Sequence, residues 1–152
     1  MLKNNKLDKS FGPVGTSAGM LLFFAGLAVT FFSFLGLILV LIGAFIGFSY
    51  TSTFIDFEKK QIKFSNNLFG FIKIGKWIRV EPDMIIRIKK SKKVWRAYSR
   101  GNRTLNITDS DYRLILYNSR NKEIIPVKKT DTLDSAKVEL HKLSDQLGLS
   151  LI

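Results

Sequence analysis

Few residues in this chain could perform chemistry. One histidine, His141, and no cysteine occur in 152 residues. The candidate carboxylate pairs are Asp109 with Asp111 and Asp131 with Asp134. A catalytic or metal site needs several matched groups around one point, and a lone histidine in a helical segment has no second ligand of its kind. We therefore expect His141 to be an exposed helix residue and the chain to have no metal site.

The two acid pairs favour structural roles. Asp109 and Asp111 lie in "TDSDY", a turn-like stretch in which aspartate caps backbone amides. Asp131 and Asp134 lie at an expected helix start, where a carboxylate offsets the helix dipole. Phosphate-binding patterns of the GxxxxGK[ST] or GxGxxG type do not occur. We predict a protein that is not an enzyme and has no cofactor; the alternative is a membrane enzyme, or its regulatory subunit, whose site the sequence does not reveal.

The most pronounced chemical feature is positive charge. The formal net charge is +12, and the segment from Arg87 to Arg103 holds eight basic residues and no acidic one, with Trp95 and Tyr98 among them. The candidate binding residues are Arg87, Lys89, Lys90, Lys92, Lys93, Trp95, Arg96, Arg100 and Arg103.

Three interpretations of this basic segment stay open. Anionic lipid would attract each nearby Lys or Arg by about 1 kcal/mol. An acidic protein partner would also fit, because arginine and aromatic residues are frequent interface anchors. In the third interpretation the charges are solvated and keep an edge strand from pairing with another molecule. Nucleic acid is the partner we favour least, because the chain also carries a membrane segment.

The elements that would position this segment begin with a long apolar block. No charge occurs from Ser10 to Ile55. One helical crossing needs about 20 apolar residues, so residues 12–50 fit two short helices, Gly15–Phe32 and Leu35–Tyr50, with a turn near Ser33. A signal peptide would end its apolar run sooner, and a core hairpin of a soluble protein would show a polar face. We therefore predict a transmembrane helical hairpin over residues 15–50.

Flanking charge predicts the orientation of the hairpin. Lysines lie before the first helix and after the second, and the turn between the helices has no charge; the lysines are Lys3, Lys6, Lys9, Lys59, Lys60 and Lys63. Positive flanks stay cytoplasmic. This pattern predicts a membrane protein with both termini in the cytoplasm. It divides the chain into a basic leader (1–14), the hairpin (15–50) and a cytoplasmic domain (51–152).

Two GxxxG patterns lie in the apolar block, Gly15–Gly19 and Gly43–Gly47. Small residues four apart let helix backbones approach closely, so we predict a packing contact within the hairpin or between copies. The alternative is that these glycines are ordinary members of membrane helices, in which glycine is common.

From Thr53 onward the period changes to that of strands, in "TFIDFEKKQIKFSN", "FGFIKIGKWIRV", "MIIRIKK", "VWRAYSR", "TLNITDS" and "YRLILYNSRNKEIIPVKK". The sequence then predicts a helix, because apolar residues recur every three or four positions, at Leu133, Ala136, Leu140, Leu143 and Leu147. Asp131 or Thr132 is the expected N-cap and Gly148 the expected stop.

"IDFEKKQIKF", "GKWIRV" and "DTLDSAKVELHKLSDQL" resemble small membrane-anchored proteins of Bacteroidetes-type bacteria with a pleckstrin-homology-like domain. The resemblance implies an α+β domain, an antiparallel curved sheet or partial barrel capped by a C-terminal helix. It brings no catalytic residues. Taken with the hairpin, it predicts a non-enzymatic adaptor or accessory subunit at the cytoplasmic leaflet. Its partner would be anionic lipid, a membrane protein or a second copy of the chain.

Overall fold

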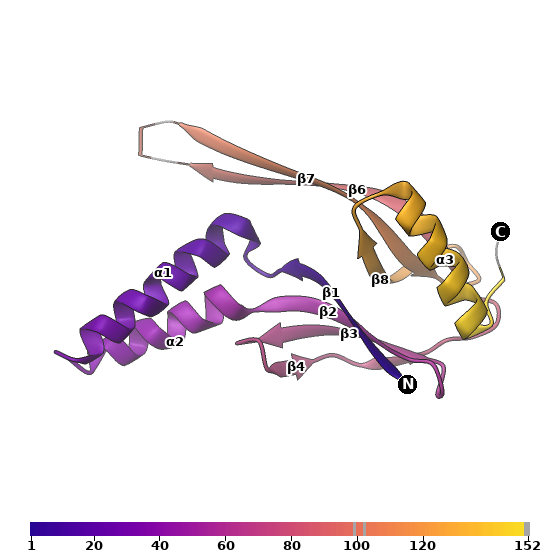
Figure 1. Ribbon diagram of the computed structural model, residues 1–152, viewed down its shortest axis with the longest axis horizontal. Helices are drawn as coiled ribbons and strands as arrows, with labels where there is room; N and C mark the ends of the chain where they lie inside the picture. The colour runs from indigo at the N-terminus through magenta and orange to yellow at the C-terminus, as the bar shows by residue number, and fades with distance from the viewer. Residues whose placement is uncertain (99, 102, 151–152) are drawn as a thin grey trace.

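The computed structural model describes residues 1–98, 100–101 and 103–150. Within them the chain forms two antiparallel sheets and three helices (Figure 1), which confirms the α+β class. The elements are β1 (Leu2–Lys9), α1 (Gly12–Thr30), α2 (Leu35–Phe48), β2 (Tyr50–Asp56), β3 (Gln61–Leu68), β4 (Ile72–Ile74), β5 (Trp77–Arg79), β6 (Ile85–Tyr98), β7 (Thr104–Tyr117), β8 (Glu123–Thr130) and α3 (Leu133–Leu147). Over the described residues the sheets do not close into a barrel.

The first sheet contains a strand that the sequence analysis left unassigned. Residues 2–9, part of the expected leader, form β1, which pairs antiparallel with β2 from Leu2 opposite Asp56 to Lys9 opposite Tyr50. β2 continues into β3, which pairs with both β4 and β5. Because α1 follows β1 and α2 precedes β2, both helices project from the same end of this sheet (Figure 1).

The second sheet, β6-β7-β8, has one long hairpin. β6 and β7 pair without a break from Ile85 opposite Tyr117 to Tyr98 opposite Thr104. The sequence analysis had divided each of these strands into two. Their distal part, residues 91–98 and 104–111, extends past the sheet beside the helix pair (Figure 1), and we call it the arm.

The core lies between the two sheets and α3. Its fully buried members come from β2, β3, β7, β8 and α3, and include Ile55, Ile62, Leu114, Leu116, Val127 and Leu143. The side-chain amide of Asn5 in β1 donates to the carbonyl of Val127 in β8 at 3.2 Å, so β1 also joins the sheets. A fragment beginning at Thr51 would lack this strand.

Local chemistry sets the ends of α3. The hydroxyl of Thr132 accepts a hydrogen bond from the backbone N–H of Ser135 at 3.2 Å, so Thr132 rather than Asp131 is the N-cap. Gly148 has φ +71°, the left-handed conformation in which glycine ends helices, as expected.

Candidate functional site

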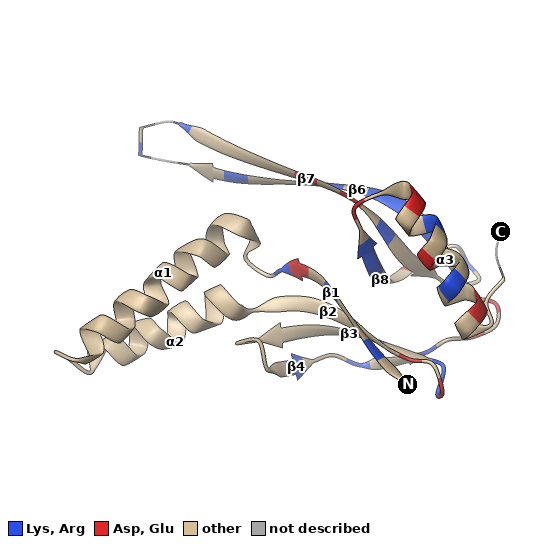
Figure 2. Cartoon of the chain, viewed as in Figure 1, with Lys and Arg blue, Asp and Glu red and all other residues tan. Residues whose placement is uncertain are grey.

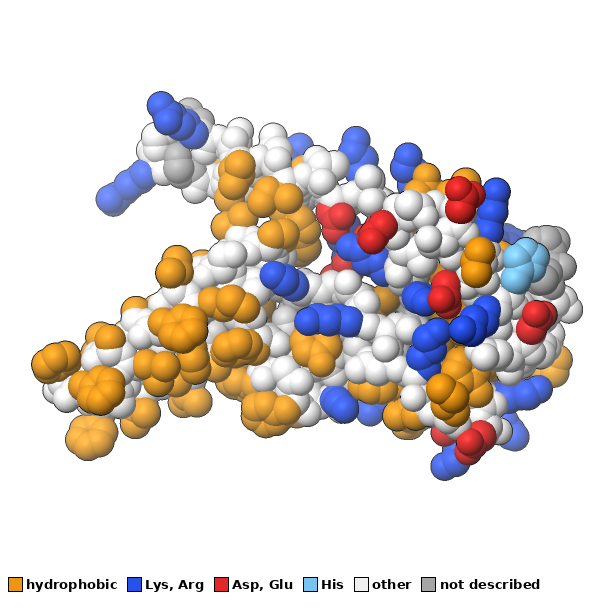
Figure 3. All heavy atoms as spheres, in the orientation of Figure 1, with side chains coloured by type: hydrophobic (Ala, Val, Ile, Leu, Met, Phe, Trp, Pro, Cys, Tyr) orange, Lys and Arg blue, Asp and Glu red, His pale blue; other side chains and the backbone are white. Residues whose placement is uncertain are grey.

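The helix pair turns its small residues inward and its large apolar residues outward. The buried residues of α1 and α2 are Gly12, Thr16, Gly19, Gly26, Gly36, Gly43 and Gly47. By contrast, Leu21 is 73% exposed, Phe24 63% and Leu41 62%. α1 is long and apolar enough to cross a membrane, whereas α2 is apolar but shorter. Figure 3 shows the resulting apolar surface around the helices.

Three of the four predicted packing glycines lie at the contact between the helices. A Cβ added to Gly19 would lie 2.5 Å from the backbone nitrogen of Gly47, and one added to Gly43 would lie 2.3 Å from that of Phe23. Any side chain at these positions would force the helices apart. Gly15 lies outside this contact, since the nearest atom to its added Cβ belongs to Phe11.

Two further glycines, which the sequence analysis missed, complete the contact. A Cβ at Gly26 would lie 2.6 Å from the nitrogen of Val40, and one at Gly36 would lie 2.3 Å from that of Thr30. Gly19 and Gly26 are about two helical turns apart, as are Gly36 and Gly43, so each pair lies on one face of its helix. This spacing in the sequence could have identified Gly26 and Gly36 as contact residues.

At the base of the helix pair, a network of ion pairs holds the arm to β1. The guanidinium of Arg113 in β7 donates from Nη1 and Nη2 to the two carboxylate oxygens of Asp8 at 2.8 and 2.9 Å. It also donates from Nε and Nη2 to the two carboxylate oxygens of Asp111 at 2.7 and 2.9 Å. Lys93 contacts Asp8 at 2.6 Å, and Lys129 contacts Asp111 at 3.1 Å and Asp109 at 2.7 Å.

The network keeps the carboxylates of Asp8 and Asp111 ionised. Burial tends to raise the pKa of Asp8, but hydrogen bonds from Arg113 and Lys93 outweigh it, so the pKa lies below its ordinary value. Burial also tends to raise the pKa of Asp111, but hydrogen bonds from Arg113 and Lys129 outweigh it, so this pKa is lowered as well. The hydrogen bond with Asp111 is the main cause that raises the pKa of Arg113. The carboxylates of Asp8 and Asp111 are thus engaged by cations.

The interpretation of Asp109 and Asp111 as turn residues is wrong. Both lie in β7, where Lys129 of β8 forms an ion pair with each of them. Asp134 does lie in the first turn of α3. His141 is exposed on α3. Over the described residues, no cluster of three His, Asp or Glu side chains is arranged to hold a metal ion.

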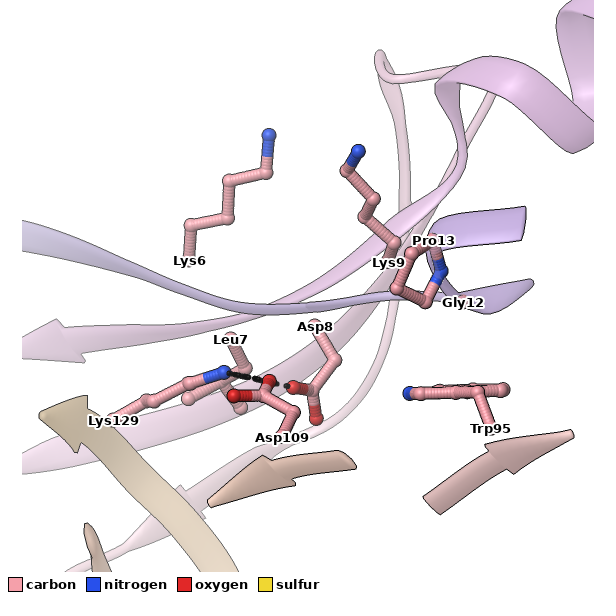
Figure 4. A pocket seen from close by; sticks show the side chains of 9 residues that line it. All are labelled: Lys6, Leu7, Asp8, Lys9, Gly12, Pro13, Trp95, Asp109 and Lys129. Atoms are coloured by element: carbon pink, nitrogen blue, oxygen red, sulfur yellow. Dashed lines mark hydrogen bonds and ion pairs between the residues drawn. The ribbon is translucent and has the colours of Figure 1, made fainter. Parts of the chain in front are cut away.

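A cavity of about 410 Å³ lies beside this network (Figure 4). Asp8, Asp109 and Lys129 line one end, and Gly12, Pro13 and Trp95 line the other. Gly12 has φ +69°, and a Cβ there would lie 2.5 Å from the ring of Trp95. The tryptophan ring thus lies directly against the start of α1, which fixes the arm relative to the helix pair.

The structure distributes the predicted basic residues over several surfaces (Figure 2). Lys93 and Trp95 face β1 and α1, so Lys90, Lys92 and Arg96, at the alternate positions, lie on the opposite, outer face of β6. At the root of the hairpin, Arg87 hydrogen-bonds Asn121 and Lys89 pairs with Glu123. Arg100 and Arg103 are exposed at the tip.

The inner face of the arm is apolar, a feature that the sequence analysis missed. Trp95 pairs with Ile107 and Ala97 with Leu105 in the strand register, so the four side chains share one face. Ile107, Val14 and Leu21 line a hollow of about 380 Å³ between the arm and α1. The alternation of Leu105 and Ile107 in "TLNITDS" was the available signal.

Comparison of the chain with protein-family models, with curated proteins and with solved structures finds no match.

Proposed function

We propose that this chain is a non-enzymatic membrane adaptor: α1 and α2 are its lipid-embedded anchor, and the two-sheet part lies at the cytoplasmic leaflet of a bacterial inner membrane. The inside-out packing of the helix pair carries the proposal. About a dozen large apolar side chains of α1 and α2 are exposed. Complete burial of one such side chain is worth about 1.5–3 kcal/mol, and these side chains are 37–73% exposed, so leaving them in water would cost on the order of 10 kcal/mol. Lipid removes that cost.

The arm supplies the second contact with the membrane. It projects on the same side of the molecule as the helix pair (Figure 2), so both reach one bilayer. Lys92 and Arg96 on its outer face, and Lys90 at its root, would each gain about 1 kcal/mol from anionic headgroups. Trp95, whose ring lies against the start of α1, would then lie at the headgroup level, where tryptophan is commonly found in membrane proteins.

A third apolar surface lies on the other side of the helix pair. The ring of Phe69, in the β3–β4 turn, contacts Phe45 of α2 with centroids 5.4 Å apart. Its neighbours Phe71, Ile72 and Ile74 are exposed. Lipid contact here and at the arm would hold the two sheets in one orientation on the membrane.

The adaptor role rests on this fixed orientation. The order of antiparallel strands followed by α3, which packs on β6, β7 and β8, supports the pleckstrin-homology-like resemblance. The face that carries α3 points away from the helix pair (Figure 1) and is available to a partner. A membrane protein or a second copy could also meet the anchor itself.

The test uses the full chain, which has no native cysteine. The chain is expected to float with liposomes and to resist carbonate extraction; release by carbonate would refute the anchor. Thr108→Cys on the arm, labelled with an environment-sensitive fluorophore, should report a less polar environment in nanodiscs containing anionic lipid than in zwitterionic ones.

Charge reversal then assigns this response to the arm. Lys90→Glu, Lys92→Glu and Arg96→Glu together should abolish the lipid-dependent signal. The matched control reverses three lysines in turns remote from the helix pair, Lys59, Lys60 and Lys122, and should retain the signal. An equal fluorescence signal in anionic and zwitterionic nanodiscs would refute the lipid role of the arm. It would favour a protein partner, or basic residues that are simply solvated.

A further inference from the structure

The connection between α1 and α2 carries the most exposed large apolar side chains among the described residues. Phe31, Phe32 and Phe34 are 89%, 92% and 88% exposed, and Ser33 is the one polar side chain among them. A loop that emerges into water on the far side of a membrane would expose three phenyl rings there. Membrane interfaces are enriched in Trp and Tyr, which this connection lacks.

Most backbone N–H groups of the connection are paired within the chain. The N–H groups of Phe31 and Phe32 donate to the carbonyls of Ala28 and Val29, and the N–H of Ser33 also donates to Val29. The N–H of Leu35 donates to the hydroxyl of Ser33. Hydrocarbon offers no partner for a backbone amide, so internal pairing of this kind is what it requires.

The arm indicates where the headgroup region begins. Ile107 of the arm and Leu21 of α1 line the same hollow. Charged residues run along the arm from Lys92 and Arg96 on its outer face to Arg100 and Arg103 at its tip, and they are too costly to place in hydrocarbon. The boundary between headgroups and hydrocarbon therefore falls no closer to the start of α1 than Leu21.

The length of α1 beyond this level is that of one leaflet. An α-helix rises about 1.5 Å per residue, so Leu21 and Phe31 are about 15 Å apart along the axis. This is half of a hydrocarbon core of about 30 Å. The whole of α2, with 14 residues, measures about 21 Å, which is also too short to cross.

We infer that the helix pair is re-entrant: it enters and leaves through the cytoplasmic leaflet, and its phenylalanine tip contacts acyl chains near the bilayer midplane. This inference rests on the proposed function, because it requires the pair to be in lipid. It replaces the two crossings expected from sequence, and it keeps both termini on the same side.

Depth measurements on the full chain test the inference. Ser33→Cys at the tip and Ser17→Cys near the start of α1 are labelled with the same fluorophore in proteoliposomes. Lipids that carry a quencher either near the headgroup or near the chain end then report depth. We expect the chain-end quencher to act more strongly at position 33 and the headgroup quencher at position 17. Stronger headgroup quenching at position 33 would overturn the inference.

Access to a membrane-impermeant maleimide gives an independent readout. Ser33→Cys should resist the reagent from both sides of the membrane and react after detergent is added. Thr108→Cys should react from the cytoplasmic side. Reaction of position 33 from the side opposite to position 108 would show a true crossing and overturn the inference. Free reaction of both positions in a chain that carbonate releases would instead refute the anchor itself.

Discussion

The ion-pair network at the root of the arm should be the most sensitive polar site in the molecule. Arg113 donates to both Asp8 and Asp111, and its side chain is 10% exposed, against 15% and 1% for the two acids. Arg113→Met removes all four of these hydrogen bonds and leaves two buried carboxylates. Breaking a buried pair by deleting one partner costs about 3–5 kcal/mol.

The expected loss lies at the low end of that range. Lys93 still contacts Asp8 at 2.6 Å and Lys129 still contacts Asp111 at 3.1 Å, so neither acid becomes fully unpaired. We therefore expect the free energy of unfolding to fall by about 3 kcal/mol. At about 2–4 °C for each kcal/mol in a chain of this size, Tm should fall by about 6–12 °C.

Thermal unfolding of the full chain in nanodiscs measures the loss. The matched control is Lys89→Met, whose pair with Glu123 is half exposed, and it should leave Tm unchanged within error. A double-mutant cycle of Arg113→Met with Asp8→Asn isolates the pair and should give a coupling of about 1 kcal/mol or more. Equal Tm values for Arg113→Met and Lys89→Met, with no coupling to Asp8, would refute the structural role of the network.

Three further outcomes are expected. In Gly43→Leu the added Cβ would lie 2.3 Å from the backbone of α1, so the helices should separate and Tm should fall. Ala28→Leu, at an exposed position of α1, should leave Tm unchanged. Equal Tm values for the two variants would contradict the glycine contact. Because the pKa values of Asp8 and Asp111 are lowered in the folded state, their contribution is complete above the unfolded value of about 3.8 and is lost as pH falls through the native values. Tm should therefore be steady from pH 7 to 5 and fall below about pH 4. The fall should be smaller in a variant without Arg113. An equal fall of Tm in this variant and in the unmodified chain would argue against the network as the cause. Thr132→Ala removes the N-cap of α3 and should cost about 1 kcal/mol, measured by denaturant unfolding; no loss would show that the cap contributes nothing.

Patterns local in the sequence determined the helices and most of the strands. The absence of charge between Lys9 and Asp56 located α1 and α2, because a charged side chain would be costly in an apolar segment. Thr132 before the periodic leucines and Gly148 after them predicted where α3 begins and ends, because helix caps act within one helical turn. The two-residue period of the strands predicted which residues share a face.

Tertiary structure alone decided which strands pair and which charges meet. β1 carries Asn and Lys at many positions, and only its pairing with β2 makes it a strand. Asp8 and Arg113 are 105 residues apart in sequence, and Trp95 meets Gly12 across two different elements. No local period encodes such contacts, because they depend on strand register and on the closeness of elements that are remote along the chain. The same contacts set the level of the arm beside α1.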